Sequence, residues 1–260
     1  MNVRPLHPQS VRPSPIFLAI VAITVAGGVL AWLAVDPEEP LARVGVFIFV
    51  IAGFLVSLCL HEFAHAYTAW RFGDRDVEVR GYLTLNPLKY SHPLLSLGLP
   101  ALFIALGGIG LPGGAVYVRT SWMTKRQKTL VSLAGPATNL VFAVVVLVVT
   151  SLFAESEHVV FWAAMAFLGF LQVTAFVLNI LPVPGLDGYS ALEPHLSPQT
   201  QRMLEPAKGW AFFVLLLLLF TPQANRWFFG VIDWLFGLSG VNPDLWKVGM
   251  LLTRFWSAWF

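Results

Sequence analysis

The stretch HEFAH at residues 61–65 contains three side chains that can bind a metal or transfer a proton. These are His61, Glu62 and His65. On a helix, residues four positions apart share a face, so the two imidazoles can bind one metal ion while the carboxylate lies beside them. A carboxylate in that position can take a proton from an attacking water molecule. The spacing therefore predicts metal-assisted hydrolysis, for which zinc is the usual metal.

The stretch follows residues 44–60, which form an almost uncharged apolar run. Ionisable side chains are costly within a bilayer and usually mark a functional site. Three of them within five residues of a membrane-spanning segment favour a metal site over a chance match.

The composition indicates a polytopic membrane protein. Of the 260 residues, 57% are hydrophobic and 12% are charged, and the mean hydropathy is +0.73. These values lie outside the range of soluble globular proteins. The net charge of +2 is spread over short loops, so nucleic acid is not an expected partner. Cys59 is the one cysteine, which excludes an internal disulfide and a cysteine-rich metal site.

We expect an all-α fold of about five to six transmembrane helices. The clearest candidate spans are residues 16–35, 44–70, 129–153, 159–181 and a further segment that ends near Phe220. The first is too long for a signal peptide and is interpreted as an uncleaved helix. Arg4 and Arg12 place the N-terminus in the cytoplasm by the positive-inside rule.

Two segments between these spans have other patterns. Basic residues on both sides of residues 94–111 predict a re-entrant loop, and its many glycines and prolines agree with that; an ordinary spanning helix is the alternative. Residues 77–85 alternate apolar with polar side chains, which predicts a short membrane-surface β-strand. Such a strand is either without a task or an edge that pairs with an unwound substrate.

A catalytic zinc usually has three protein ligands, so the two histidines need one more. Asp187 is the best candidate, because the expected topology returns it to the side of the membrane on which the histidines lie. Pro182, Pro184 and Gly185 would end the preceding helix and hold the carboxylate on irregular backbone. The alternative for Asp187 is an ordinary turn, since Asp-Gly is a common turn dipeptide.

The HExxH helix, the segment 135–139 (GPATN) and the segment 179–188 (NILPVPGLDG) together resemble the site-2 protease family of intramembrane zinc metalloproteases. Residues 85–89 (LNPLK) are similar to an insert of its compact branch, which lacks a PDZ domain. The resemblance implies His61, His65 and Asp187 as ligands of one Zn²⁺ per chain and Glu62 as general base. It also implies Asn179 and Asn139 as polar groups at the cleavage site; a helix-to-helix hydrogen bond is an equal alternative for Asn139.

Two stretches depart from the pattern of that branch, at residues 90–93 and 112–116, so substrate entry is expected to differ. His92 in the first is either a further functional group or merely solvated. We divide the chain into an N-terminal helix with its outer loop (1–43), a catalytic core (44–192) and C-terminal transmembrane and interfacial helices (193–260). The last part carries tryptophans among charged residues, which is typical of a membrane interface.

The leading hypothesis is an intramembrane zinc endopeptidase that cleaves transmembrane segments of single-pass membrane proteins. Its setting would be a prokaryotic cytoplasmic membrane, with the active site toward the cytoplasm. The alternatives are a non-catalytic zinc-binding scaffold and a metal-ion transporter. The catalytic-type Glu62 argues against the scaffold, and the sequence shows no internal repeat of the kind that transporters often have.

Overall fold

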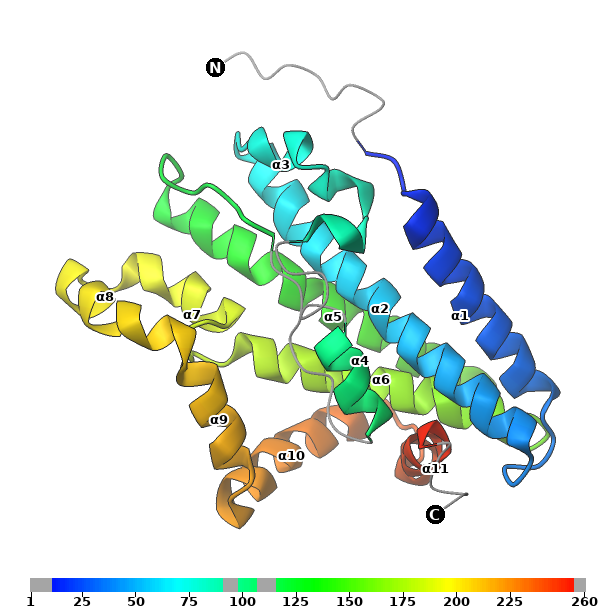
Figure 1. Ribbon diagram of the computed structural model, residues 1–260. Coiled ribbons are helices and arrows are strands. Elements are labelled where there is room, and N and C mark those ends of the chain that lie inside the picture. Colours follow the sequence, from blue (N-terminus) through cyan, green and yellow to red (C-terminus); the bar gives the residue numbers. More distant parts are fainter. Residues whose placement is uncertain (1–10, 91–97, 107–115, 255–260) are drawn as a thin grey trace.

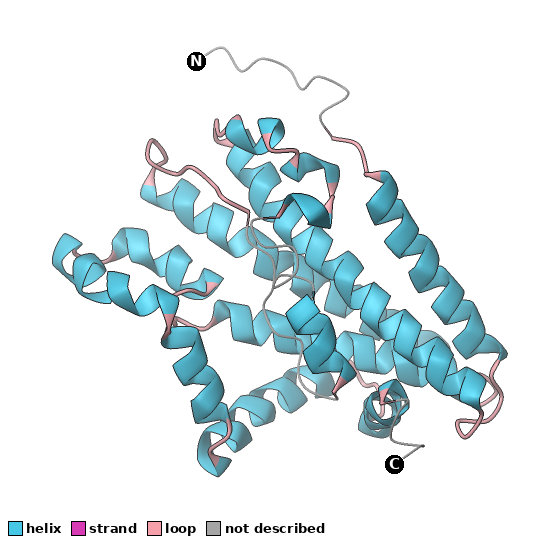
Figure 2. Ribbon diagram, viewed as in Figure 1, coloured by secondary structure: helices cyan, strands magenta, loops and turns pink. Residues whose placement is uncertain are grey.

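The computed structural model describes residues 11–90, 98–106 and 116–254. Within these ranges all regular secondary structure is helical (Figure 2). The four long helices are α1 (Pro15–Leu33), α2 (Pro40–Arg71), α5 (Lys125–Phe153) and α6 (Val159–Ile180). Each is long and apolar enough to cross a membrane. They match the first four predicted spans, and their ends differ from the predicted ones by at most four residues.

The remaining elements are short and lie mainly after α6 and between α2 and α5. The shorter α-helices are α3 (Asp76–Val79), α4 (Leu99–Ala105), α7 (Asp187–Leu192), α8 (Pro198–Leu204), α9 (Ala211–Leu219), α10 (Pro222–Gly237) and α11 (Pro243–Thr253). The 3₁₀ turns are η1 (Tyr82–Thr84), η2 (Pro87–Lys89), η4 (Glu193–His195) and η5 (Glu205–Gly209). Helix α9 stands where the fifth span was predicted, and its nine residues extend only about 14 Å.

Helix α2 runs through the centre of the bundle, with α1 on one side and α5 and α6 on the other (Figure 1). Helix α6 is the most enclosed of the four, with 78% of its apolar window buried, whereas α1 has 22%. Glycines bring α1 and α2 into backbone contact. A Cβ built on Gly27 would lie 2.5 Å from the backbone nitrogen of Phe49, and one on Gly45 would lie 2.6 Å from that of Ala31. Small residues at such a contact let membrane helices approach closely.

The ends of the helices meet in the way that the expected topology requires. At one end of the bundle, His158 Nδ1 lies 3.0 Å from Trp32 O, which joins the start of α6 to the end of α1. At the other end, Trp122 Nε1 donates to Phe72 O at 3.2 Å, just before α5 and just after α2. The hydroxyl of Thr129 near the start of α5 donates to Ala191 O of α7. Helix α7 therefore lies at the same end as the C-terminal half of α2.

The predicted strand at residues 77–85 is wrong, because these residues form α3, η1 and the turns around them. Gly81 and Leu85 have φ values of 76° and 56°, which a continuous strand does not contain. The apolar positions also do not share a face, since Val77 is fully buried while Val79 is 87% exposed. Packing against the end of α2 therefore overrides an alternation that is too short to require a sheet partner.

Of residues 94–111, the structure describes 98–106, which contain the seven-residue helix α4. Helix α4 packs against α2 (Figure 1). Seven residues extend about 10 Å, which is a third of the hydrocarbon thickness. The re-entrant loop remains a prediction, because its two ends lie outside the described residues, as does His92.

Candidate metal centre

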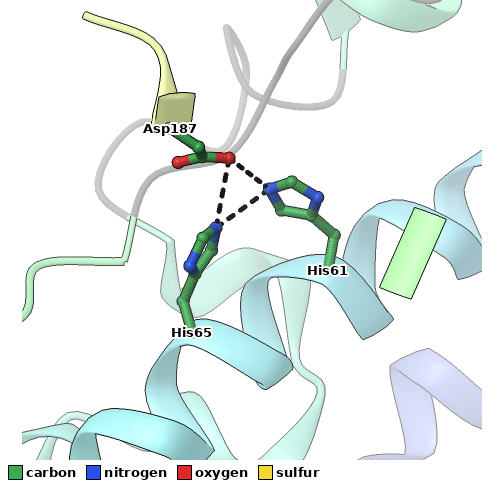
Figure 3. Close-up of side chains that lie close together, drawn as sticks. All are labelled: His61, His65 and Asp187. Carbon is green, nitrogen blue, oxygen red and sulfur yellow. Dashed lines mark hydrogen bonds and ion pairs between the residues drawn. The ribbon is translucent and has the colours of Figure 1, made fainter. Parts of the chain in front are cut away.

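Helix α2 presents His61 and His65 on one face, and their imidazoles point toward the same space (Figure 3). Both residues are buried, and so is Glu62 between them. The planes of the two imidazole rings form an angle of 76°, so the rings do not stack. This orientation brings their Nε2 atoms close together. The four-residue spacing thus has the geometric effect predicted from the sequence.

Asp187 reaches this face of α2 because the chain breaks just after α6. That helix ends at Ile180, two residues before Pro182, and α7 begins at Asp187 itself. Gly185 in the connecting loop has a φ of 97°, a conformation that favours glycine. Gly188 packs so closely on Ile180 O that no side chain would fit there. The proline, glycine and Asp-Gly signals of the sequence therefore all shape the turn that presents the carboxylate.

The three side chains converge on one point (Figure 3). Asp187 Oδ2 lies 3.2 Å from His61 Nε2 and 3.4 Å from His65 Nε2, and the two Nε2 atoms are 3.0 Å apart. Two ligand atoms of a tetrahedral zinc, each about 2.05 Å from the metal, are separated by roughly 3.3 Å. Two imidazole nitrogens and one carboxylate oxygen are also a common ligand set of catalytic zinc. The donor set and its spacing therefore fit Zn²⁺.

Helix α5 closes the other side of this centre at Gly135, in the segment that the sequence singled out. A Cβ built on Gly135 would overlap His65 Nε2 and lie 2.5 Å from His61 Nε2. A glycine is therefore required there for a geometric reason that the sequence did not show.

Helix α5 also contacts the Nδ1 atom of each imidazole ring, on the side away from Asp187. His61 Nδ1 lies 2.6 Å from Asn139 Oδ1, and His65 Nδ1 lies 2.7 Å from the carbonyl oxygen of Val131. Both acceptors carry no hydrogen, so each Nδ1 is the donor in these bonds. An imidazole that donates from Nδ1 can bind a metal through Nε2, and in both rings Nε2 is the nitrogen that faces Asp187.

Sequence reasoning missed two polar residues behind Asn139. Its Nδ2 donates to Ser57 Oγ at 3.2 Å and to Gln172 Oε1 at 2.9 Å, and Ser57 Oγ in turn donates to Gln172 Oε1. Two signals in the sequence could have found them. Ser57 stands four residues before His61 on the same helical face, and Gln172 is a polar amide within an apolar spanning segment, where such groups are costly.

Two further residues of the predicted site have other surroundings. Glu62 Oε2 accepts a hydrogen bond of 3.0 Å from the backbone nitrogen of Val116, which lies between α4 and α5. Asn179 is buried in the last turn of α6. Among the described residues its side chain has no hydrogen bond, so the structure does not join it to the histidines, to Asp187 or to Asn139.

The exposure of Asp187 distinguishes it from the histidines. Its side chain is 24% exposed, whereas those of His61 and His65 are 7% and 9% exposed, so the centre is most accessible on the side of the carboxylate. A carboxylate beside two imidazoles completes a set of three ligands that could hold one metal ion.

The model of the family described as Peptidase family M50 matches residues 49–156, which include most of α2 and all of α5. The protein of Mycolicibacterium smegmatis named “Putative zinc metalloprotease Rip2” is 68% identical over 260 residues, which cover 100% of both chains. A protein of the same name from Mycobacterium tuberculosis strain H37Rv is 64% identical over 252 residues, 97% of each chain.

A more distant relative has a similar name. The “Putative zinc metalloprotease YwhC” of Bacillus subtilis is 31% identical over 185 residues, which cover 68% of this chain and 82% of its own. No solved structure matches the chain. The length and identity of these matches, together with the three motifs brought together at the metal centre, show that this chain belongs to peptidase family M50, the family of the site-2 proteases.

Proposed function

We propose that this protein is an intramembrane zinc endopeptidase that hydrolyses peptide bonds in or near the transmembrane segments of single-pass membrane proteins. The observation that carries the proposal is the convergence of His61, His65 and Asp187 on one point beside Glu62. Family membership and the names of the relatives support the same activity.

The roles of the residues follow from their chemistry. His61, His65 and Asp187 would hold one Zn²⁺ per chain, which supplies Lewis acidity to the scissile carbonyl and the attacking water. Glu62 takes a proton from that water and passes it to the leaving amine. The amide of Asn179, which has no hydrogen bond to the described residues, is suited to donate to the developing oxyanion.

The hydrogen bonds of Asn139 to the described residues support a role other than contact with the substrate. Its oxygen faces His61, and both hydrogens of its Nδ2 are engaged by Ser57 and Gln172. No N–H group remains for an oxyanion. This arrangement supports the helix-to-helix alternative over direct contact with the substrate.

The chain is an integral membrane protein, as its four long apolar helices and its family indicate. Helix α2 ends at Arg71, six residues or about 9 Å beyond His65. The zinc would then lie roughly one-third of the way into the hydrocarbon from the side of the basic loops. We assign that side to the cytoplasm of a prokaryotic cell by the positive-inside rule.

Zinc content tests the proposed site without a known substrate. We expect detergent-purified wild type to contain about one zinc per chain and Asp187→Ala to lose most of it, because two histidines alone hold zinc weakly. Asp233→Ala, which removes an exposed carboxylate of α10, is the control and should keep its zinc. Equal zinc in wild type and Asp187→Ala would show that Asp187 is not a ligand.

Glu62→Gln tests the activity itself. The amide keeps the size of the side chain but cannot accept a proton, so we expect zinc to remain bound while cleavage falls roughly 10²–10⁴-fold. Cleavage would be followed by mass spectrometry of a panel of single-pass membrane segments, reconstituted with the protein in liposomes. Retained cleavage would remove Glu62 from the mechanism. A zinc-loaded wild type that cleaves no segment while moving zinc across the vesicle membrane would favour the transporter.

A further inference from the structure

Ser57, Asn139 and Gln172 form a polar cluster deep within the spanning helices. Each comes from a different helix, α2, α5 and α6 respectively, and their exposed fractions are 1%, 3% and 0%. Polar side chains at such a place are expensive and need a compensating role. One member, Asn139, contacts His61 on the nitrogen that faces away from Asp187.

The hydrogen bonds of this cluster have a fixed direction. His61 Nε2 needs a free lone pair to bind a metal, so Nδ1 carries the hydrogen and donates it to Asn139 Oδ1. The amide of Asn139 must then turn its Nδ2 toward Ser57 and Gln172. Gln172 Oε1 accepts from both Asn139 Nδ2 and the hydroxyl of Ser57. If the oxygen and nitrogen of the Gln172 amide were exchanged, its Nε2 would face Asn139 Nδ2, and both of these groups are donors.

Gln172 uses only its oxygen in this arrangement. Among the described residues, its buried Nε2 has no hydrogen-bond partner. A buried N–H group without a partner destabilises the folded state. A residue that served only to join the helices would therefore not need the Nε2 group of Gln172. The place of Gln172 is better explained by what its oxygen does for Asn139.

We propose that Gln172 is a positioning residue of the metal centre. Through Asn139, and with the help of Ser57, its carbonyl oxygen holds His61 in the orientation and tautomer that direct Nε2 toward the metal. This inference rests on the proposed function and deepens it, because it assigns a role to residues behind the ligands. Outer hydrogen bonds of this kind typically change metal affinity 10–100-fold.

Zinc affinity of the full-length protein in detergent, measured by competition with a chelator, tests the proposal. We expect Gln172→Met, which keeps the length but removes the acceptor, to bind zinc about tenfold more weakly. Gln172→Glu should restore wild-type affinity, since a carboxyl group buried in apolar surroundings takes up a proton and keeps a carbonyl oxygen. Thr174→Val is the matched control on α6, because Thr174 is as buried but, among the described residues, its hydroxyl bonds only to Phe170 O of its own helix.

Two further measurements, the unfolding temperature and the visible absorption with bound Co²⁺, distinguish a positioning role of Gln172 from a structural one. Without metal, we expect Gln172→Met to unfold at a lower temperature than wild type and Gln172→Glu at about the wild-type temperature, because methionine offers no acceptor to the donors of Asn139 and Ser57 whereas a carboxyl group does. With Co²⁺ in place of zinc, the visible absorption of Gln172→Met should differ from that of wild type, because the orientation of one imidazole ligand changes. Loss of thermal stability without rescue by Gln172→Glu would show a structural role and overturn the proposal.

A double-variant cycle shows whether Gln172 acts through Asn139. If it does, Asn139→Leu combined with Gln172→Met binds zinc no more weakly than Asn139→Leu alone; additive losses would overturn the inference. Should Gln172→Met not fold, Ser57→Ala tests the same chain of bonds with a smaller change and an expected loss of a few fold. Wild-type affinity in both Gln172→Met and Ser57→Ala overturns the inference alone, whereas absence of zinc from wild type overturns the proposed function as well.

Discussion

Gly135 is the residue at which the metal centre has the least space. A single methyl group there would lie 2.2 Å from His65 Nε2 and 2.5 Å from His61 Nε2, closer than atoms in van der Waals contact. We predict that Gly135→Ala lowers zinc affinity by at least about tenfold, since overpacking costs roughly 1–3 kcal/mol and each 1.4 kcal/mol is a factor of ten. Zinc titration of the purified protein measures this. Helix propensity alone would favour alanine over glycine at this position.

Gly230→Ala on α10 is the control for this change. A Cβ on Gly230 meets no atom within 4 Å, so the variant should gain helix propensity and keep its zinc. If Gly135→Ala also bound zinc as wild type does, α5 would not close over the imidazoles as described.

The loop between α6 and α7 is the element that presents Asp187, the proposed third ligand. Gly185 in this loop combines a positive φ with a close contact, because an added Cβ would lie 2.9 Å from Lys208 O. We predict that Gly185→Ala destabilises the loop by roughly 1–3 kcal/mol and weakens zinc binding, because Asp187 follows two residues later. The zinc affinity and the melting temperature would both be measured.

Gly209→Ala in η5 provides the comparison, since Gly209 has no atom within 4 Å of an added Cβ and lies beside the same contact. It should leave zinc binding unchanged. A normal affinity in Gly185→Ala would indicate that the loop adapts and that α7 alone sets the place of Asp187.

These elements also show what the sequence can and cannot predict. Spanning helices and helix ends are local properties, so apolar runs and the prolines after Ile180 predicted the first four spans and their ends well, whereas the fifth predicted span contains only the nine-residue α9. The strand at residues 77–85 failed because a short alternation does not reveal how α3 and η1 pack on α2. The roles of Ser57 and Gln172 depend on how three helices are turned about their axes, and no single segment contains that information.

For the molecule as a whole, zinc should act as a clamp between α2 and α7. A ligand that binds only the folded state stabilises it, by about 4 kcal/mol when its concentration is 1,000 times its Kd. We predict that removing zinc with a chelator lowers the melting temperature in detergent by several degrees. Zinc added back should reverse the change.

Asp187→Ala separates this effect from a general action of the chelator. Without its third ligand, the variant should melt at a temperature that the chelator hardly changes. An equal shift in wild type and variant would mean that the stabilising metal is bound elsewhere.

The distribution of the ligands over the chain has a consequence for biosynthesis. The ribosome makes α2 with both histidines long before α7 emerges with Asp187, and α5 and α6 must enter the membrane in between. A nascent chain therefore carries an incomplete site until most of it has been made. An enzyme that needs Asp187 as a ligand can become active only at that late stage of its own synthesis.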